Sequence, residues 1–154
     1  MRTLGIDYGD ARTGLAITDA LGITAQGLET VTTNGNDKIL LSKLDEIMSI
    51  YEIDIFVVGM PLNMNGTKTE RVEKTKKFIH KLKCKYNKIK IETVDERLTT
   101  VQAHRTMNEL GVKPKNKKSI VDTISAVYIL ETYINNQSRK PLQEKRRGND
   151  VLME

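Results

Sequence analysis

Short apolar runs alternate with turn residues over the first third of the chain. The first run covers residues 2–8, the second residues 13–19 and the third residues 23–31. Glycine and aspartate lie between the first two runs, where they favour a tight turn. This spacing predicts three strands that pair one after another as an antiparallel meander.

Helix and strand patterns alternate after this opening. Apolar residues at helical spacing predict an amphipathic helix over residues 37–51. The continuous apolar run at residues 55–58 is typical of a strand that is buried on both faces. A second helix over residues 69–85 and a strand over residues 89–94 follow.

Two more helices close the pattern. Thr99 and Gln102 match a capping box at the start of one helix, and residues 119–134 form a last, largely apolar helix. Apolar residues are then sparse, which predicts a mobile tail over residues 137–154. We expect residues 1–136 to form a single α/β domain. Its mixed sheet should have about five strands, an antiparallel meander and then parallel strands, with helices on both faces.

The composition is that of an ordinary globular protein, with 38% apolar and 29% charged residues among 154. No apolar stretch approaches the roughly 18–20 residues that span a bilayer. Asp7 interrupts the N-terminal apolar run before a signal peptide could form. Cys84 has no second cysteine to pair with, so an internal disulfide is excluded. We expect Cys84 to pack at a helix end, and the protein to be cytoplasmic.

Three acidic residues are candidate ligands of a catalytic metal ion. Asp7 and Glu96 end two of the predicted strands, and Asp122 lies in the first turn of the last helix. Carboxylates that converge at strand ends suit Mg²⁺ or Mn²⁺, which prefer oxygen ligands. A structural interpretation stays open for each: Asp122 also fits a capping box with Ser119, and Glu96 also fits a charged turn.

The formal net charge of +5 bears on the class of substrate, because an acidic metal site on a basic protein suggests a phosphodiester. Lys117 and Lys118 lie on a basic loop just before Asp122, so they are candidate phosphate contacts or, alternatively, part of a solvated loop. Further candidate nucleic-acid contacts are Arg12, Asn63 and Arg97.

Four motifs in order resemble the YqgF/RuvX family, whose members are described as Holliday junction resolvases or pre-16S rRNA nucleases. The resemblance covers nearly the whole chain, and its motifs lie at residues 5–14, 58–67, 95–100 and 117–122. It implies a ribonuclease H-like fold in which Asp7, Glu96 and Asp122 form the acidic metal site. One departure is that Ser125 and Ala126 follow Asp122, where related resolvases often carry a further acid. A site of three acids should hold a second metal less firmly.

The leading interpretation is therefore a metal-dependent nuclease that acts in 5′-end processing of pre-16S rRNA. The chain lacks an obvious aromatic wedge for opening a junction, so a Holliday junction resolvase is the alternative. A catalytically silent nucleic-acid-binding module is an alternative of another class. An actin-like ATP-binding protein would need two lobes of this fold. We expect precursor rRNA or branched DNA as the partner, together with ribosomal particles, no membrane, and a monomer or weak homodimer.

Overall fold

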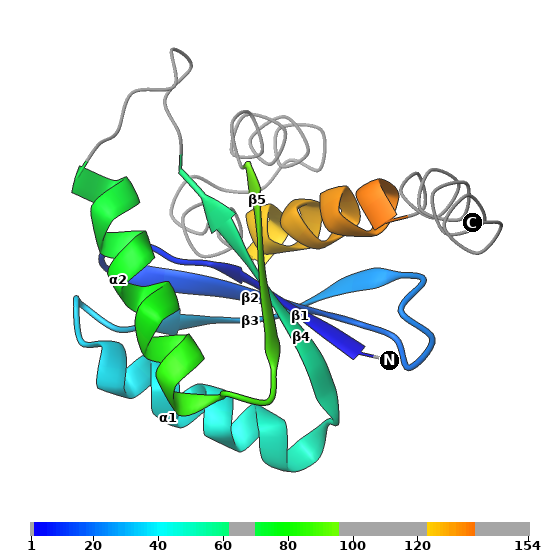
Figure 1. The fold of residues 1–154 in the computed structure, drawn as a ribbon, viewed down its shortest axis with the longest axis horizontal. Coiled ribbons are helices and arrows are strands. Elements are labelled where there is room, and N and C mark those ends of the chain that lie inside the picture. Colours follow the sequence, from blue (N-terminus) through cyan, green and yellow to red (C-terminus); the bar gives the residue numbers. More distant parts are fainter. Residues whose placement is uncertain (1, 62–69, 96–122, 138–154) are drawn as a thin grey trace, which may run out of the picture.

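The computed structural model describes residues 2–61, 70–95 and 123–137, and these residues form a sheet flanked by helices (Figure 1). The predicted helix after Thr99, the start of the last helix and residues 138–154 lie outside the described residues. The elements are β1 (Arg2–Asp7), β2 (Arg12–Thr18), β3 (Ala25–Thr32), α1 (Asp37–Ile50), β4 (Ile53–Met60), α2 (Glu70–Lys85), β5 (Lys90–Asp95) and a helix over residues 123–137.

The five strands form one mixed sheet in the order β3-β2-β1-β4-β5. β1 pairs antiparallel with β2, and β2 antiparallel with β3, as the meander predicts. β4 is parallel to both β1 and β5. The prediction of a mixed α/β sheet with helices on both faces is confirmed, and β1 is its central strand.

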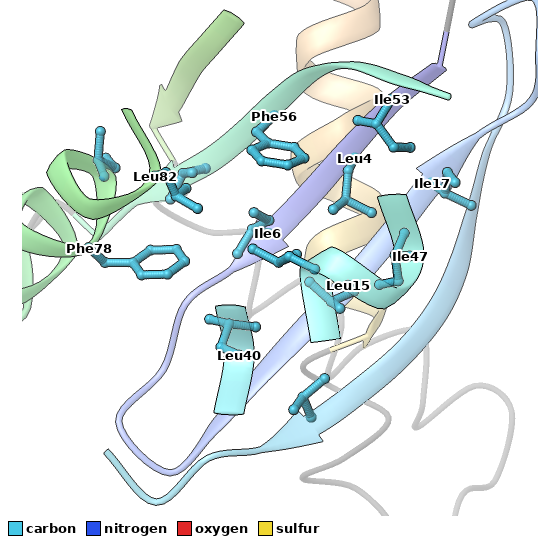
Figure 2. Packing of buried hydrophobic residues seen from close by; sticks show 14 residues of the cluster. Leu4, Ile6, Leu15, Ile17, Leu40, Ile47, Ile53, Phe56, Phe78 and Leu82 are labelled. Carbon is cyan, nitrogen blue, oxygen red and sulfur yellow. The ribbon is translucent and has the colours of Figure 1, made fainter. Parts of the chain in front are cut away.

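Alternating residues of the sheet build two separate cores. Leu4 and Ile6 of β1 face α1 and α2, in the larger core that Figure 2 shows. The helix over residues 123–137 covers the other face, where it packs on Ala16, Val57 and Val94. Figure 2 shows Leu40 and Ile47 of α1 and Phe78 and Leu82 of α2 over the strands, with the last helix behind the sheet.

Several observed details differ from the sequence prediction. The last helix continues to residue 137, beyond its predicted end at residue 134 and onto the first residue of the predicted tail. β4 is longer than residues 55–58, because it pairs on both sides and its last residue Met60 still pairs with Asp95. Cys84 is exposed, so the prediction that it packs is wrong. The apolar stripe of α2 ends at Leu82, and Cys84 lies on the outer side of the last turn. None of the helices that the structure describes is long and apolar enough to cross a membrane.

The last helix lies very close to the sheet because two strand positions are glycine. A Cβ at Gly5 would lie 2.6 Å from Cγ of Leu130, and one at Gly27 would lie 2.5 Å from Cγ2 of Thr123. Real side chains do not reach such distances, so any larger residue would push the helix away. The glycines thus set how near this helix comes to the central strand β1 at Gly5 and to the edge strand β3 at Gly27.

Candidate functional site

Asp7 is the last residue of the central strand, where it is half-buried. Because β4 and β5 run parallel to β1, their carboxyl ends lie at the same edge of the sheet, at Met60 and Asp95. Functional groups of open α/β sheets gather at this edge. The structure therefore places Asp7 where the sequence predicts a site.

Asp7 lies on the face of the sheet that the last helix covers. Successive strand residues point to opposite faces. Leu4 and Ile6 belong to the core under α1 and α2, whereas Gly5 contacts Ala126 and Leu130 of the last helix. Two residues beyond Gly5, the Asp7 side chain projects on the same side.

A hydrogen bond holds Thr123 of the last helix level with Asp7. Asp7 pairs with Gly14 of β2, and Gly14 pairs with Thr30 of β3. The hydroxyl oxygens of Thr30 and Thr123 are 2.6 Å apart. Thr123 is the first described residue of the last helix, so the described part of this helix begins on the row of the sheet that holds Asp7.

A β-bulge makes this contact possible. The pairing of β2 with β3 shifts between Leu15 and Ala16, so that Ala16 pairs with Gly27 while Gly14 pairs with Thr30. The extra residue lets both Gly27 and Thr30 face the same helix residue, Thr123. Bulges often redirect side chains beside functional sites. No residue pattern in the sequence predicts the bulge between β2 and β3.

The turn that follows Asp7 is held by both other helices. The Tyr8 ring stacks on Phe78 of α2, with centroids 4.3 Å apart and planes 9° from parallel. The Tyr8 hydroxyl donates to Asp37 of α1 at 2.6 Å, and Lys81 of α2 binds the other carboxylate oxygen at 2.9 Å. Burial raises the pKa of the Tyr8 phenol, and the Asp37 hydrogen bond raises it further, so this hydroxyl stays protonated.

Backbone contacts fix the same turn. Arg71 of α2 donates to the carbonyl oxygen of Tyr8 at 3.3 Å. A Cβ at Gly9 would collide with the carbonyl oxygen of Arg12, so the turn requires glycine there. Arg12 itself opens β2, is half-buried and pairs with Thr32. The turn from Tyr8 to Arg12 therefore gives Asp7 a defined position, as functional carboxylates need.

The other predicted site residues border the described part of the chain or lie outside it. Glu96 is the next residue after Asp95, and Asp122 is the one before Thr123. Within residues 2–61, 70–95 and 123–137, no cluster of three or more His, Cys, Asp or Glu forms a metal site. Apart from Glu96 and Asp122, the predicted contacts that lie outside the described residues are Asn63, Arg97, Lys117 and Lys118.

The sequence matches known proteins over most of its length. The RuvX family model, described as Holliday junction resolvase, matches residues 1–136. A "Putative pre-16S rRNA nuclease" of Ruminiclostridium cellulolyticum is 53% identical over 135 residues, which cover 88% of this chain and 94% of that protein. A protein of the same name from Acetivibrio thermocellus is 48% identical over 139 residues, 90% of this chain and 99% of that protein.

Solved structures share the fold at low sequence identity. Thermus thermophilus RuvC superposes with a TM-score of 0.52 at 13% identity, over 90% of this chain and 97% of that one. Fowlpox virus resolvase, solved with Holliday junction DNA, superposes with a TM-score of 0.53 at 14% identity, over 89% of this chain and 99% of that one. The likeness confirms the predicted ribonuclease H-like architecture. With a family match that spans residues 1–136 and relatives this similar, the chain belongs to the RuvX family.

Proposed function

We propose that this protein is a divalent-metal-dependent nuclease that hydrolyses phosphodiester bonds in structured nucleic acid, with 5′-end processing of pre-16S rRNA as its reaction. Family membership and the names of the relatives support this proposal. The structural observation that carries it is the Thr30–Thr123 contact, which sets Thr123 of the last helix level with the half-buried Asp7.

Asp7, Glu96 and Asp122 are the proposed ligand set. Val94 faces the last helix, and Glu96 follows two positions later in the sequence. Ala126 rests on the same face of the sheet, and Asp122 precedes it by four positions. This spacing in the sequence is the reason for including both acids with Asp7 in the proposed set.

The donor chemistry fits hard divalent cations. Carboxylate oxygens are the preferred ligands of Mg²⁺ and Mn²⁺, and a metal pair supplies an activated water and neutralises a leaving oxygen. Asp7 offers an oxygen donor whose backbone is anchored through Tyr8 on one side and β-pairing with Gly14 on the other. Such anchoring holds a ligand in place before the cation arrives.

Substrate contacts would come from cationic and amide side chains around that edge. Arg12 lies at the far end of the turn that follows Asp7, and its charge suits a phosphate of the bound strand. We propose the same role for Asn63, Arg97, Lys117 and Lys118. Ribosomal particles as the assembly that presents the substrate, and a monomer or weak homodimer, belong to the same proposal.

Cleavage of two substrates side by side tests the function. Purified protein is incubated with a precursor 16S rRNA transcript or with a four-way DNA junction, in Mg²⁺, Mn²⁺ or EDTA. We expect metal-dependent cleavage of the transcript near its 5′ end. Cleavage of the junction alone would instead assign the resolvase activity that the family description names. Binding of both substrates without cleavage of either would identify a silent binding module.

A further inference from the structure

Helix α2 carries cations on two flanks that differ in their surroundings. On one flank, every described cation has a partner elsewhere in the molecule. Lys74 binds Asp10 at 3.4 Å, Lys81 binds Asp37 at 2.9 Å and Lys85 binds Asp45 at 2.7 Å. Arg71 donates to the Tyr8 carbonyl. This flank fastens α2 to α1 and to the turn after Asp7, so its charges are used within the fold.

The opposite flank presents basic side chains to solvent. Lys76, His80 and Lys83 follow one another at helical spacing, and Lys77 lies beside them. All are exposed, and the described residues give none of these lysines an ion-pair partner. We call these four residues the α2 basic flank. Its lysine charges remain available to an external anion.

The α2 basic flank borders two shallow hollows, one of which reaches the carboxyl edge of the sheet. Met60, at the end of β4, and Thr93 of β5 join α2 residues in lining it. Met60 pairs with Asp95, the last residue of β5. The residues lining this hollow are Met60, Lys76, Ile79, His80, Lys83 and Thr93. The second hollow, on the outer side of α2, is lined by Glu73, Lys76, Lys77, His80 and Lys81.

We infer that the α2 basic flank binds the phosphate backbone of a double-stranded arm of the nucleic acid, outside the cleavage site. The inference deepens the proposed function and rests on it for the class of ligand. Lys76 and Lys83 are seven residues apart, or about 10 Å along a helix. At about 3.4 Å of rise per nucleotide, that length follows roughly three nucleotides of one strand.

A paired arm suits this surface better than a single strand. Proteins that hold single strands stack the bases on aromatic side chains. The α2 basic flank has no Phe, Tyr or Trp, and offers cations beside an open hollow. Contacts of that kind position a backbone without reading its sequence. The arm would leave the edge that holds Asp7 and continue along α2 beside β5.

Duplex binding with matched double variants tests the inference. Lys76→Ala/Lys83→Ala removes two charges from the α2 basic flank. Lys38→Ala/Lys88→Ala removes two charges from exposed lysines that lie on α1 and in the turn after α2, again without ion-pair partners among the described residues. Binding to an RNA duplex and to a DNA duplex of the same sequence is titrated at several salt concentrations. EDTA is present throughout, so that the result does not depend on cleavage.

We expect the flank variant to bind more weakly than the control variant, with a slope of log affinity against log salt that is shallower by about two. Weaker binding of both duplexes by the flank variant supports a general phosphate surface, whereas an effect on one duplex alone identifies RNA or DNA as the arm. Equal binding by the two variants would overturn the inference, as would a wild-type protein that binds neither duplex.

Two further measurements separate this inference from the proposed function. If the wild-type protein cleaves precursor rRNA but the flank variant binds like the control, the inference fails and the nuclease stands. If no cleavage occurs but duplex binding depends on the flank, the nuclease fails and the binding surface stands. Poly-glutamate serves as an acidic polypeptide probe, and a flank effect on it without an effect on the duplexes would also overturn the inference.

Discussion

The hydrogen bond from Tyr8 to Asp37 provides a sharp test of how the turn after Asp7 is held. Tyr8→Phe removes only the hydroxyl and keeps the ring that stacks on Phe78. The Asp37 side chain is 16% exposed, so water replaces the lost donor poorly. Asp37 still keeps Lys81 at 2.9 Å, which limits the loss.

The expected cost follows from the charge and burial of the acceptor. Hydrogen bonds to charged groups contribute about 1.5–3 kcal/mol. Because Lys81 remains, we expect the lower end, a loss of about 1.5 kcal/mol in the free energy of unfolding. For a chain of this size, that lowers the thermal midpoint by roughly 3–6 °C. Urea denaturation followed by circular dichroism measures the free energy directly.

The chain contains a matched control. Tyr86 donates to Asp45 at the same distance, 2.6 Å, and Lys85 binds the other Asp45 oxygen at 2.7 Å. Here the acceptor side chain is 52% exposed, so water can take the place of the phenol. Tyr86→Phe should therefore cost less, about 0.5 kcal/mol. If Tyr86→Phe lowers the free energy of unfolding as much as Tyr8→Phe does, burial of the acceptor carboxylate does not determine the cost of losing the hydrogen bond.

Three other variants test the last helix and the proposed site. Gly5→Ala should destabilise the protein by about 1–3 kcal/mol, because the new Cβ would meet Leu130 at 2.6 Å; a thermal midpoint equal to wild type would contradict the close approach. Ser125→Ala should leave stability unchanged or raise it by up to about 1 kcal/mol, because the buried hydroxyl has no hydrogen-bond partner among the described residues; a clear loss in urea denaturation would point to a partner for it. Asp122→Asn should abolish cleavage with little change in stability if Asp122 binds metal, whereas a loss of about 1 kcal/mol or less with activity retained would show that it only caps the helix.

The strand pattern was predictable because apolar and polar residues alternate along a half-buried strand, and a fully buried strand is continuously apolar. Leu4 and Ile6 indicated a first strand, and the continuous run around Val57 indicated a strand buried on both faces. The position of Asp7 at the end of the first strand was predictable as well, whereas its role as a metal ligand stays a prediction. Cys84 was missed because its surroundings in the sequence are helical, and only the packed stripe of α2 shows which side faces outward.

The contacts that set the geometry of the site were not predictable from spacing. Tyr8 and Asp37 are 29 positions apart, and each alone fits an ordinary turn or helix start. Thr30 and Thr123 are 93 positions apart, and their contact depends on a bulge with no sequence signal. Gly5 and Gly27 were visible as glycines, but only the close approach of the last helix explains them.

The central claim is that Asp7 belongs to the acidic metal site of a nuclease. Its most direct test is cleavage of precursor 16S rRNA in Mg²⁺ by the wild-type protein and by Asp7→Asn, with thermal melting of both. We expect Asp7→Asn to lose cleavage while its melting temperature stays equal or rises, because fewer carboxylates then repel one another at the sheet edge. An Asp7→Asn protein that cleaves at the wild-type rate would contradict the assignment.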